Sequence, residues 1–433
     1  MTRSRWGLWG LICLVTALAV SIALHVGPDS GWLSAVAVLA GGLAYAMMAI
    51  NLLLASRRPI LERLFGPLDR IYTAHRVIGS SILAVIGLHL VLIPIASAVD
   101  RGVSLLENLS VAVPLGVVGL LLLAGSIALS LNPKVAYDRW QRVHAATGAA
   151  FLLLTAHMAL GANAWIGFTG PAGFFLGCFA VLGIVSFLVR LVDKTRGGMP
   201  YVVVATSPRE RGLEVVMKPE GTRALAGHRP GQFAFLAASN GTARETHPFT
   251  LTSPHGSERV GILIRSSGDW TAAAQAGIAV GDRVRLDGPF GAFTPRLDAP
   301  TPQVWIAGGA GITPFLSVLR TARESGGDHR GQVELIVAAH EQSDAPCWSE
   351  LSEHARHLPW LTLTPAFAAD GGRLDRDTIR RHVDHTPKDA DWYLCGPPAL
   401  VALVNDVLRH AGTDASHVHT ERYQWRSASR SER

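Results

Sequence analysis

The stretch IYTAHRVIGSSILAVIGLHLVLIPIASAV, residues 71–99, carries almost no charge and contains two histidines, His75 and His89. About 20 apolar residues suffice to cross the hydrocarbon core of a bilayer. A backbone in that environment satisfies its hydrogen bonds only as a helix or a closed barrel, so this stretch predicts a transmembrane helix. An ionisable side chain in such a helix is costly, which makes both histidines candidate functional residues.

Apolar segments of similar length lie on both sides of this stretch. With it, they form six predicted spans: Trp6–Val26, Trp32–Ala55, Ile71–Val99, Val111–Leu131, Val143–Leu160 and Ala172–Val192. The chain is 49% hydrophobic and 17% charged, and beyond Lys194 it has the composition of a water-soluble protein. The first segment, preceded by Arg3 and Arg5, could instead be a cleaved signal peptide, but its apolar run is longer than is usual there. We therefore expect a six-helix membrane domain followed by a soluble part.

The basic residues between the spans predict their orientation. They concentrate in the second-to-third and fourth-to-fifth connections and after the sixth span: Arg57, Arg58, Arg63, Arg70, Lys134, Arg139, Arg142, Arg190, Lys194 and Arg196. The intervening connections carry Arg101. Because cytoplasmic loops are enriched in Lys and Arg, both termini and the soluble half are expected in the cytoplasm of a cell (inner or plasma) membrane protein. This placement also explains much of the net charge of +6 without a nucleic-acid partner.

The four cysteines, Cys13, Cys178, Cys347 and Cys395, form no CxxC pair. This spacing argues against both a disulfide framework and a zinc site.

The fifth span repeats the histidine pattern with His144 and His157. Both histidine-bearing spans run in the same direction, so His75 and His144 share a cytoplasmic level, and His89 and His157 an outer one. Spacings of 14 and 13 residues separate the levels by roughly 20 Å at 1.5 Å per residue. Two b-type haems, each bound by one imidazole from each span, would fit this pattern. The alternative is that each histidine is a buried polar residue bonded to a neighbouring helix.

Two details of the pattern bear on geometry. At about 100° per residue, 14 residues return near the same helix face but 13 do not. The fifth span is therefore expected to be tilted, bent or locally rewound, unless the haems approach from different angles. Gly79, Gly148 and Gly161, each about one turn after a histidine, are expected to give a flat macrocycle room to approach.

The soluble half begins with short strands near Tyr201–Ala205, Leu213–Lys218 and Gly231–Leu236, which predict an antiparallel β-barrel closing near Asp287–Gly291. From Gln303 the pattern changes to alternating strands and helices, which predicts a doubly wound parallel sheet. Its first strand, Val304–Ala307, leads into GGAGITP, residues 308–314, and a helical run. A glycine loop between a strand and a helix is typical of a phosphate site.

These segments resemble the ferredoxin–NADP reductase superfamily. With the membrane half, they resemble the NADPH oxidase / ferric reductase family from about Trp32 to Trp425. The resemblance implies a multidomain membrane protein with a six-helix transmembrane haem bundle (residues 1–195), an antiparallel β-barrel FAD domain (196–299) and an α/β doubly wound parallel-sheet NAD(P) domain (300–426). A disordered tail, 427–433, would follow.

The resemblance also implies roles for single residues. The flavin segment HPFTLTS supplies His247, Pro248, Phe249, Thr250 and Ser253, and the FAD pyrophosphate would meet Arg265, Gly268, Trp270 and Thr271. The nicotinamide nucleotide would be held by Gly308, Gly309, Gly311, Thr313 and Pro314. The nicotinamide-side loop would be formed by Cys395, Gly396 and Pro397, with Cys395 near the hydride path, while Tyr423, or else Trp425, would cover the flavin. The haem ligands would be His75, His89, His144 and His157.

Structural roles remain open for several of these side chains. Cys395 could be a small hydrophobic residue at a strand end, Arg265 a solvated strand charge, Trp270 part of the barrel packing, and Tyr423 a packed residue of a terminal strand.

The implied activity carries electrons from cytoplasmic NADPH or NADH through FAD and two haem b groups to an extracytoplasmic acceptor. That acceptor could be dioxygen, giving superoxide, or a ferric or cupric ion or a quinone. Alternatively, the chain delivers electrons to an extracytoplasmic partner protein, or is a non-redox transporter with proton-carrying histidines. The segment His340-Glu341-Gln342-Ser343-Asp344 carries two acids and leans toward NADH, unless Arg373 or Arg376 folds into the site.

Overall fold

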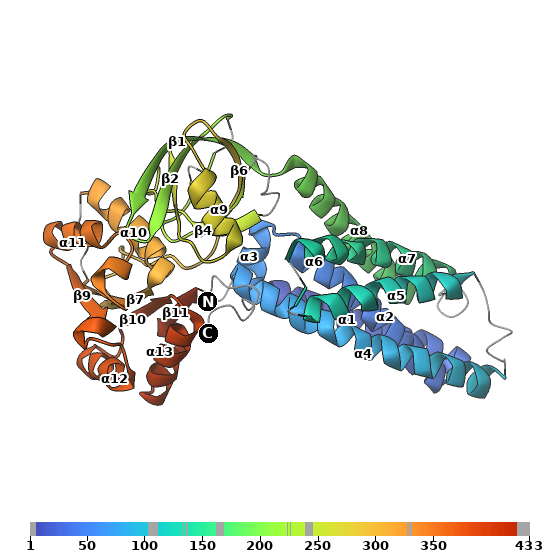
Figure 1. The fold of residues 1–433 in the computed structure, drawn as a ribbon. Coiled ribbons are helices and arrows are strands. Elements are labelled where there is room, and N and C mark those ends of the chain that lie inside the picture. Colours follow the sequence, from blue (N-terminus) through green and yellow to red (C-terminus); the bar gives the residue numbers. More distant parts are fainter. Residues whose placement is uncertain are drawn as a thin grey trace. The chain divides into compact units, whose positions relative to one another are not determined.

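The computed structural model (Figure 1) describes residues 6–102, 111–132, 134–135, 137–161, 169–222, 224–225, 227–238, 246–326, 329 and 331–421. The chain divides into two compact units, and the boundary between them lies between Arg196 and Gly197. Tyr423, Trp425 and the tail 427–433 lie outside the described residues.

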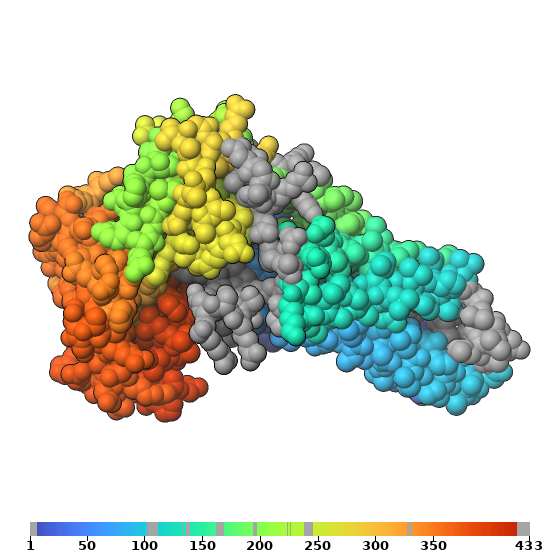
Figure 2. All heavy atoms as spheres, viewed as in Figure 1, coloured from blue at the N-terminus to red at the C-terminus, as the bar shows by residue number. Residues whose placement is uncertain are grey.

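The first unit is helical. Its helices are α1 (Trp6–Ser30), α2 (Trp32–Ala55), α3 (Pro59–Phe65), α4 (Leu68–Arg101), α5 (Ala112–Leu131), α6 (Tyr137–His144), α7 (Ala146–Gly161) and α8 (Pro171–Arg196). Six spans within the described residues are long and apolar enough to cross a membrane, which confirms the predicted number. Large apolar side chains such as Val77 and Val91 of α4 and Leu121 of α5 remain exposed, as expected of helices that face lipid. The blue and teal surface of these helices is visible in Figure 2.

Helix α2 lies at the centre of this unit. It packs against α1, α4, α7 and α8, while α5 packs against α6 and α7. The histidine-bearing helix α4 therefore has α2 as its main partner, and α7 has α5. Small residues of α2 that are buried in this packing, including Ala37, Ala40 and Ala44, let the helices approach closely.

The fifth span is interrupted immediately after His144. Helix α6 ends at His144 and α7 begins at Ala146. The Gly148 N–H bonds to Ala145 O, three residues back, at 3.3 Å, so the chain is locally wound more tightly than an α-helix. This rewinding is of the kind that the 13-residue spacing of His144 and His157 requires.

The second unit begins with a six-stranded antiparallel sheet in the order β4-β3-β6-β1-β2-β5. The strands are β1 (Met199–Arg209), β2 (Gly212–Pro219), β3 (Phe233–Ala238), β4 (Thr246–Thr250), β5 (Val260–Ile264) and β6 (Arg283–Phe290). An antiparallel bridge between Leu251 and Ile262 joins the two edges of the sheet. The side chains of Tyr201, Met217 and Leu286 fill its interior, and α9 (Asp269–Gly277) packs beside β5.

A five-stranded parallel sheet follows, in the order β11-β10-β7-β8-β9. Its strands are β7 (Gln303–Gly308), β8 (Val333–Ala339), β9 (Leu361–Phe367), β10 (Asp391–Cys395) and β11 (Val418–Glu421). The connecting helices are α10 (Thr313–Glu324), α11 (Trp348–His357), α12 (Arg376–His385) and α13 (Pro398–His410). The first strand lies in the middle and the chain winds outward on both sides, which is the predicted doubly wound order.

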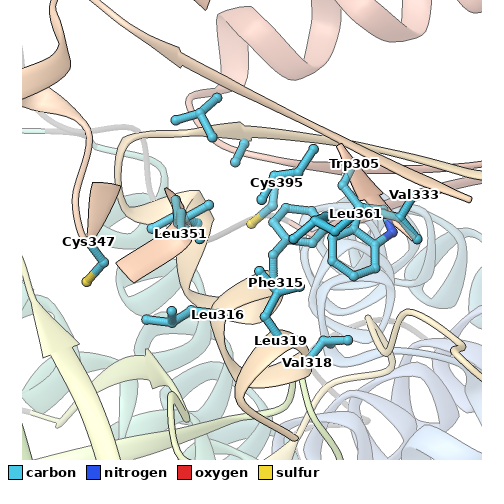
Figure 3. Packing of buried hydrophobic residues seen from close by; sticks show 14 of the residues in the cluster. Trp305, Phe315, Leu316, Val318, Leu319, Val333, Cys347, Leu351, Leu361 and Cys395 are labelled. Carbon is cyan, nitrogen blue, oxygen red and sulfur yellow. The ribbon is translucent and has the colours of Figure 1, made fainter. Parts of the chain in front are cut away.

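Strand β7 explains the two-layer packing. Its alternate residues Trp305 and Ala307 join a cluster with α10 and α11, whereas Val304 and Ile306 join a second cluster with α12 and α13. The first cluster (Figure 3) includes the stacked rings of Trp305 and Phe315, with centroids 5.1 Å apart. Because both faces of the sheet are covered, its central strands β7 and β10 are almost entirely buried.

A buried ion network joins the two sheets of the second unit. Arg320 of α10 donates to Glu214 of β2 at 2.5 Å and to Glu350 of α11 at 2.6 Å. Burial opposes ionisation of Glu350, but the adjacent His354 imidazole and the Arg320 guanidinium outweigh it and lower its pKa to about 2. The Glu350 side chain is only 20% exposed, so little solvent screens the pair.

Substitution of Glu350 by glutamine is expected to destabilise the second unit at pH 7 but much less near pH 3. A carboxylate whose pKa falls from 4.5 to about 2 on folding stabilises the fold above pH 4.5 and loses this contribution as the pH falls toward 2. The shift corresponds to about 3 kcal/mol at neutral pH. Thermal unfolding of the full chain at both pH values measures it.

Glu353→Gln provides the matched control on the same helix. Glu353 pairs with Arg323, and both side chains are more than 40% exposed, so a small effect at either pH is expected. An equal loss in both variants would contradict the role assigned to the buried network.

Candidate functional site

All four membrane histidines are held through the same ring nitrogen, Nδ1. At the outer level, His89 Nδ1 lies 2.9 Å from Ala37 O of α2, and His157 Nδ1 lies 2.7 Å from Ala112 O of α5. At the inner level, His75 Nδ1 lies 3.1 Å from Asn51 O of α2. A carbonyl oxygen only accepts, so these three rings carry their proton on Nδ1 and present Nε2 as the electron-pair donor.

The fourth histidine is held by side chains. Ser130 Oγ lies 3.1 Å from His144 Nδ1, donates its single proton to Ser126 O at 2.7 Å and accepts from Trp140 Nε1 at 2.9 Å. Since that proton is already used, Ser130 accepts from His144 Nδ1–H. The indole of Trp140 also stacks on the His144 ring, with centroids 5.2 Å apart. Nδ1 is therefore again the protonated nitrogen, which leaves Nε2 as the electron-pair donor.

The inner pair has the separation that an iron between two imidazoles requires. Two metal–nitrogen bonds of about 2 Å place the ring centroids about 6 Å apart. The centroids of His75 and His144 are 6.0 Å apart, with the rings inclined at 74°. His89 and His157 lie within electrostatic range of each other. The residues present thus fit haem groups bound by axial imidazoles.

Among the described residues, no group of three or more His, Cys, Asp or Glu side chains could hold a metal ion. Each histidine does bond to a neighbouring helix, as a purely structural histidine would. These bonds use Nδ1, and a metal-binding histidine commonly uses the nitrogen that does not face the metal in the same way, to fix the orientation of its ring.

The glycines near the histidines differ from the sequence-based expectation. A Cβ at Gly148 would lie 2.0 Å from the Phe187 ring, one at Gly79 would lie 3.0 Å from Asn51 Nδ2, and one at Gly161 would lie 3.6 Å from Ala112 Cβ. All three positions lie against side chains of other helices. For Gly148 a neighbouring side chain covers the face that the spacing had assigned to a macrocycle, whereas for Gly79 and Gly161 the expected approach of a macrocycle stays a prediction.

The flavin segment lies on β4, which pairs with β3 so that His247 faces Leu236 and Thr250 faces Phe233. Trp270, at the start of α9, stacks on His247 with ring centroids 4.3 Å apart. Its Nε1 is buried without a hydrogen-bond partner among the described residues, and so is the Ser253 hydroxyl. Buried polar atoms of this kind normally find partners, so both atoms suit a bound polar ligand such as FAD.

Thr271 and Gly268 form the turn that leads into α9. Thr271 Oγ1 accepts from Ser267 N at 2.8 Å and donates to Gly268 O at 2.9 Å. These contacts tie the turn to the start of the helix, where an anion is favoured.

The glycine loop follows β7 as predicted. Thr313 Oγ1 donates to Ala310 O at 2.9 Å, and Pro314 occupies the first turn of α10. A Cβ at Gly311 would lie 2.1 Å from Cys395 O, and one at Gly308 would lie 2.8 Å from Pro397 Cδ. The loops after β7 and β10 therefore touch, which brings Gly308, Gly311, Cys395, Gly396 and Pro397 together.

A cavity of about 780 Å³ opens at this edge of the sheet. Its lining includes Gly309, Pro397, His340 and three arginines, Arg211, Arg265 and Arg373. Arg265 approaches the glycine loop so closely that a Cβ at Gly309 would lie 2.1 Å from its Nη1. The guanidinium is thus placed at the nucleotide loop, not on a solvated strand surface.

Two other sequence-based candidates, Cys395 and Trp270, take part in side-chain packing. The Cys395 side chain is 1% exposed and belongs to the apolar cluster of Figure 3. Trp270 packs against His247 and Phe249, so it contributes to the barrel-side packing as well. Arg211 and the Ser130–Trp140 pair carry no local motif, and sequence reasoning missed them.

Three family models match the chain in succession. Residues 40–155 match the family described as ferric reductase like transmembrane component. Residues 201–294 match an FAD-binding domain, and residues 305–406 match an oxidoreductase NAD-binding domain. This order of domains is the ferric reductase / NADPH oxidase arrangement.

Individual relatives match about half of this chain, or share its general fold. The reductase component of propane 2-monooxygenase from Rhodococcus jostii (strain RHA1) is 30% identical over 253 residues, which cover 53% of this chain and 66% of that protein. A flavohemoprotein from Bacillus subtilis (strain 168) is 23% identical, covering 56% of this chain and 64% of that protein. The chain thus spans just under two thirds of these relatives. A solved flavohemoglobin from Malassezia yamatoensis, 18% identical with a TM-score of 0.51, covers 94% of this chain and 99% of its own; it shows likeness of fold alone.

Proposed function

We propose, from the ferric reductase / NADPH oxidase arrangement of its domains, that this chain is an NAD(P)H oxidoreductase that carries electrons across a membrane. The electrons would pass from NAD(P)H through FAD and two b-type haems to an acceptor on the far side, either dioxygen, giving superoxide, or ferric iron. The observation that carries this proposal is the pair His75 and His144, whose rings have the 6.0 Å separation that would allow both imidazoles to bind one iron.

The bound groups supply the redox chemistry, since a flavin converts an electron pair into single electrons and haems pass single electrons on. The chain supplies position and environment. Nδ1 bonds to α2 and α5 orient the four imidazoles, and the glycine loop binds the nucleotide phosphates. Arg265, which the resemblance assigns to the FAD pyrophosphate, lies at the glycine loop and would reach the nucleotide phosphates from there. The segment from His247 to Ser253, with Trp270 and Thr271, holds the flavin in its barrel domain.

The contacts at the ends of the helices support the orientation proposed from the loop charges. Arg58, after α2, pairs with Asp193, near the end of α8, at 2.9 Å. At the other end of α2, Ser34 N donates to Asp100 near the end of α4 at 2.7 Å. The second-to-third connection and the end of α8 thus belong to one side, which we assign to the cytoplasm of the cell membrane.

The cavity charges favour NADPH over NADH. The one acid among its lining residues, Asp344, is paired with Arg211 at 2.5 Å, while Arg265 and Arg373 add two further positive charges. In the folded cavity, Arg211, a residue distant in sequence, neutralises Asp344. The cavity therefore favours NADPH, whereas the acidic segment 340–344 taken as sequence alone favoured NADH.

Substitution of Arg373 by alanine is expected to weaken NADPH binding about tenfold and to change NADH binding little. One charge-assisted hydrogen bond to the extra phosphate contributes about 1.5–3 kcal/mol, and 1.4 kcal/mol is a tenfold change in affinity. Dissociation constants for both nucleotides measure it. Arg376→Ala is the control, since Arg376 pairs with Asp406 at 2.6 Å. Equal losses for both nucleotides in Arg373→Ala would contradict the assignment.

The absorption spectrum of the purified full-length protein tests the main proposal. We expect a low-spin haem Soret band with a flavin shoulder and two haems per chain. Oxidation of NADPH with oxygen, ferric citrate or a quinone as acceptor, with and without a superoxide scavenger, then identifies the acceptor. A protein that is colourless despite ample haem supply would overturn the proposal, and nucleotide oxidation that stalls with every small acceptor would indicate a protein partner.

A further inference from the structure

Two glycines of the non-ligand helices lie directly against the outer histidines. A Cβ at Gly41 of α2 would be 2.7 Å from His89 Nδ1, and one at Gly116 of α5 would be 2.7 Å from His157 Nδ1. Side-chain carbons do not approach other heavy atoms this closely in folded proteins, so a methyl group at either position would displace the whole ring. Both glycines touch the Nδ1 side of the ring, opposite the nitrogen assigned to the iron.

Each glycine lies four residues after the residue whose carbonyl its histidine contacts. His89 bonds to Ala37 O, four residues before Gly41, and His157 bonds to Ala112 O, four residues before Gly116. In an α-helix the carbonyl of residue i already accepts the N–H of residue i+4. Its second lone pair can also accept an imidazole N–H, here from a ring that lies directly over residue i+4. With glycine there, no Cβ blocks that path.

The inner histidines are held in other ways. His75 bonds to Asn51 O near the end of α2, where the residue four positions on is Ala55, the last residue of the helix. His144 bonds to the Ser130 hydroxyl. The glycine arrangement therefore occurs at both outer positions and at neither inner one.

We infer that Gly41 and Gly116 are positioning residues that open a helix carbonyl to each outer histidine and thereby fix its Nε2 toward the outer iron. The inference rests on the haem ligation proposed above, and it adds that a single methyl group on a non-ligand helix disturbs one haem of the two. Because a metal-binding histidine depends on the partner of its other nitrogen, we expect a large effect on the outer haem.

The test compares Gly116→Ala with Gly125→Ala in the purified full-length protein. Both are the same substitution in α5, but a Cβ at Gly125 meets no atom within 4 Å. Haem content, low-spin electron paramagnetic resonance signals and a redox titration are measured on each. Gly116→Ala is expected to lose one haem equivalent, or to shift one signal and one midpoint potential, whereas Gly125→Ala keeps both haems unchanged.

Gly41→Ala supplies an independent check from a different helix. It must alter the same signal as Gly116→Ala, because the two glycines serve the two ligands of one iron. Unchanged signals in Gly116→Ala, changes to different haems in the two variants, or loss of both haems in either would overturn the inference. Absence of haem from the unsubstituted protein would instead overturn the proposed function.

Discussion

Replacement of His89 by leucine is expected to abolish electron delivery to acceptors on the far side of the membrane while dyes that accept electrons from the flavin are still reduced. His89 is an outer-level ligand in the proposed path, and the dinucleotide and flavin segments belong to the other unit of the chain. Removing only the supporting partner of a metal-binding histidine costs about 10–100-fold, so loss of the ligand itself should reduce the outward rate by more than about 100-fold. Steady-state rates with a flavin-directed dye and with an impermeant acceptor in oriented vesicles measure the two activities separately.

His25→Leu is the control for this experiment. His25 is also a histidine of an apolar helix, but it is exposed near the end of α1. Both activities should be unchanged in that variant. If His89→Leu lost both activities to the same extent, the assigned order of carriers would be wrong, since the flavin end of the path would then depend on the outer ligand.

The features that could be predicted from the sequence are those that depend on residues adjacent to one another in the chain. The six spans follow from runs of apolar residues, and the dinucleotide loop follows from the glycines between β7 and α10. A tilt, bend or local rewinding of the fifth span was one expectation from the 13-residue spacing, but its position at Ala145 was not predicted, because no proline marks it. In each case the signal is local, so neighbouring helices or strands are not needed to interpret it.

What the sequence did not reveal depends on contacts between distant segments. Gly41 and Gly116 look like ordinary small residues of apolar helices until α4 and α7 bring imidazoles against them. Gly148 showed the opposite error, since its spacing from His144 suggested a haem contact while its Cα in fact faces Phe187. The pairing of Arg211 with Asp344 likewise reverses the expected charge of the nucleotide cavity.

The contact between the two loops at the edge of the parallel sheet makes Gly311 the most sensitive position of the nucleotide site. A Cβ there would lie 2.1 Å from Cys395 O, 2.4 Å from Cys395 C and 2.7 Å from Gly396 N. All three are backbone atoms of the β10 loop, so no side chain can rotate away to relieve the overlap. The loops after β7 and β10 must then separate, and with them the two sides of the nucleotide cavity.

Gly311→Ala is therefore expected to lower the rate of flavin reduction by NADPH by more than about 100-fold, because a displacement of about 1 Å in a reacting pair has an effect of that size. Flavin content should be retained, since the flavin segment lies on β4 of the other sheet. Anaerobic stopped-flow reduction of the flavin by NADPH measures the rate, and reduction by dithionite confirms that the flavin remains competent.

Gly221→Ala is the matched control, because a Cβ at Gly221 meets no atom within 4 Å. It should reduce its flavin at the unsubstituted rate. Normal NADPH-driven reduction in Gly311→Ala would show that the two loops need not touch for the nucleotide to bind, and the assignment of Gly311 and Cys395 to one nucleotide site would have to be abandoned. Loss of flavin from Gly311→Ala would indicate that the parallel sheet supports the flavin domain through the Arg320 network as well as binding the nucleotide.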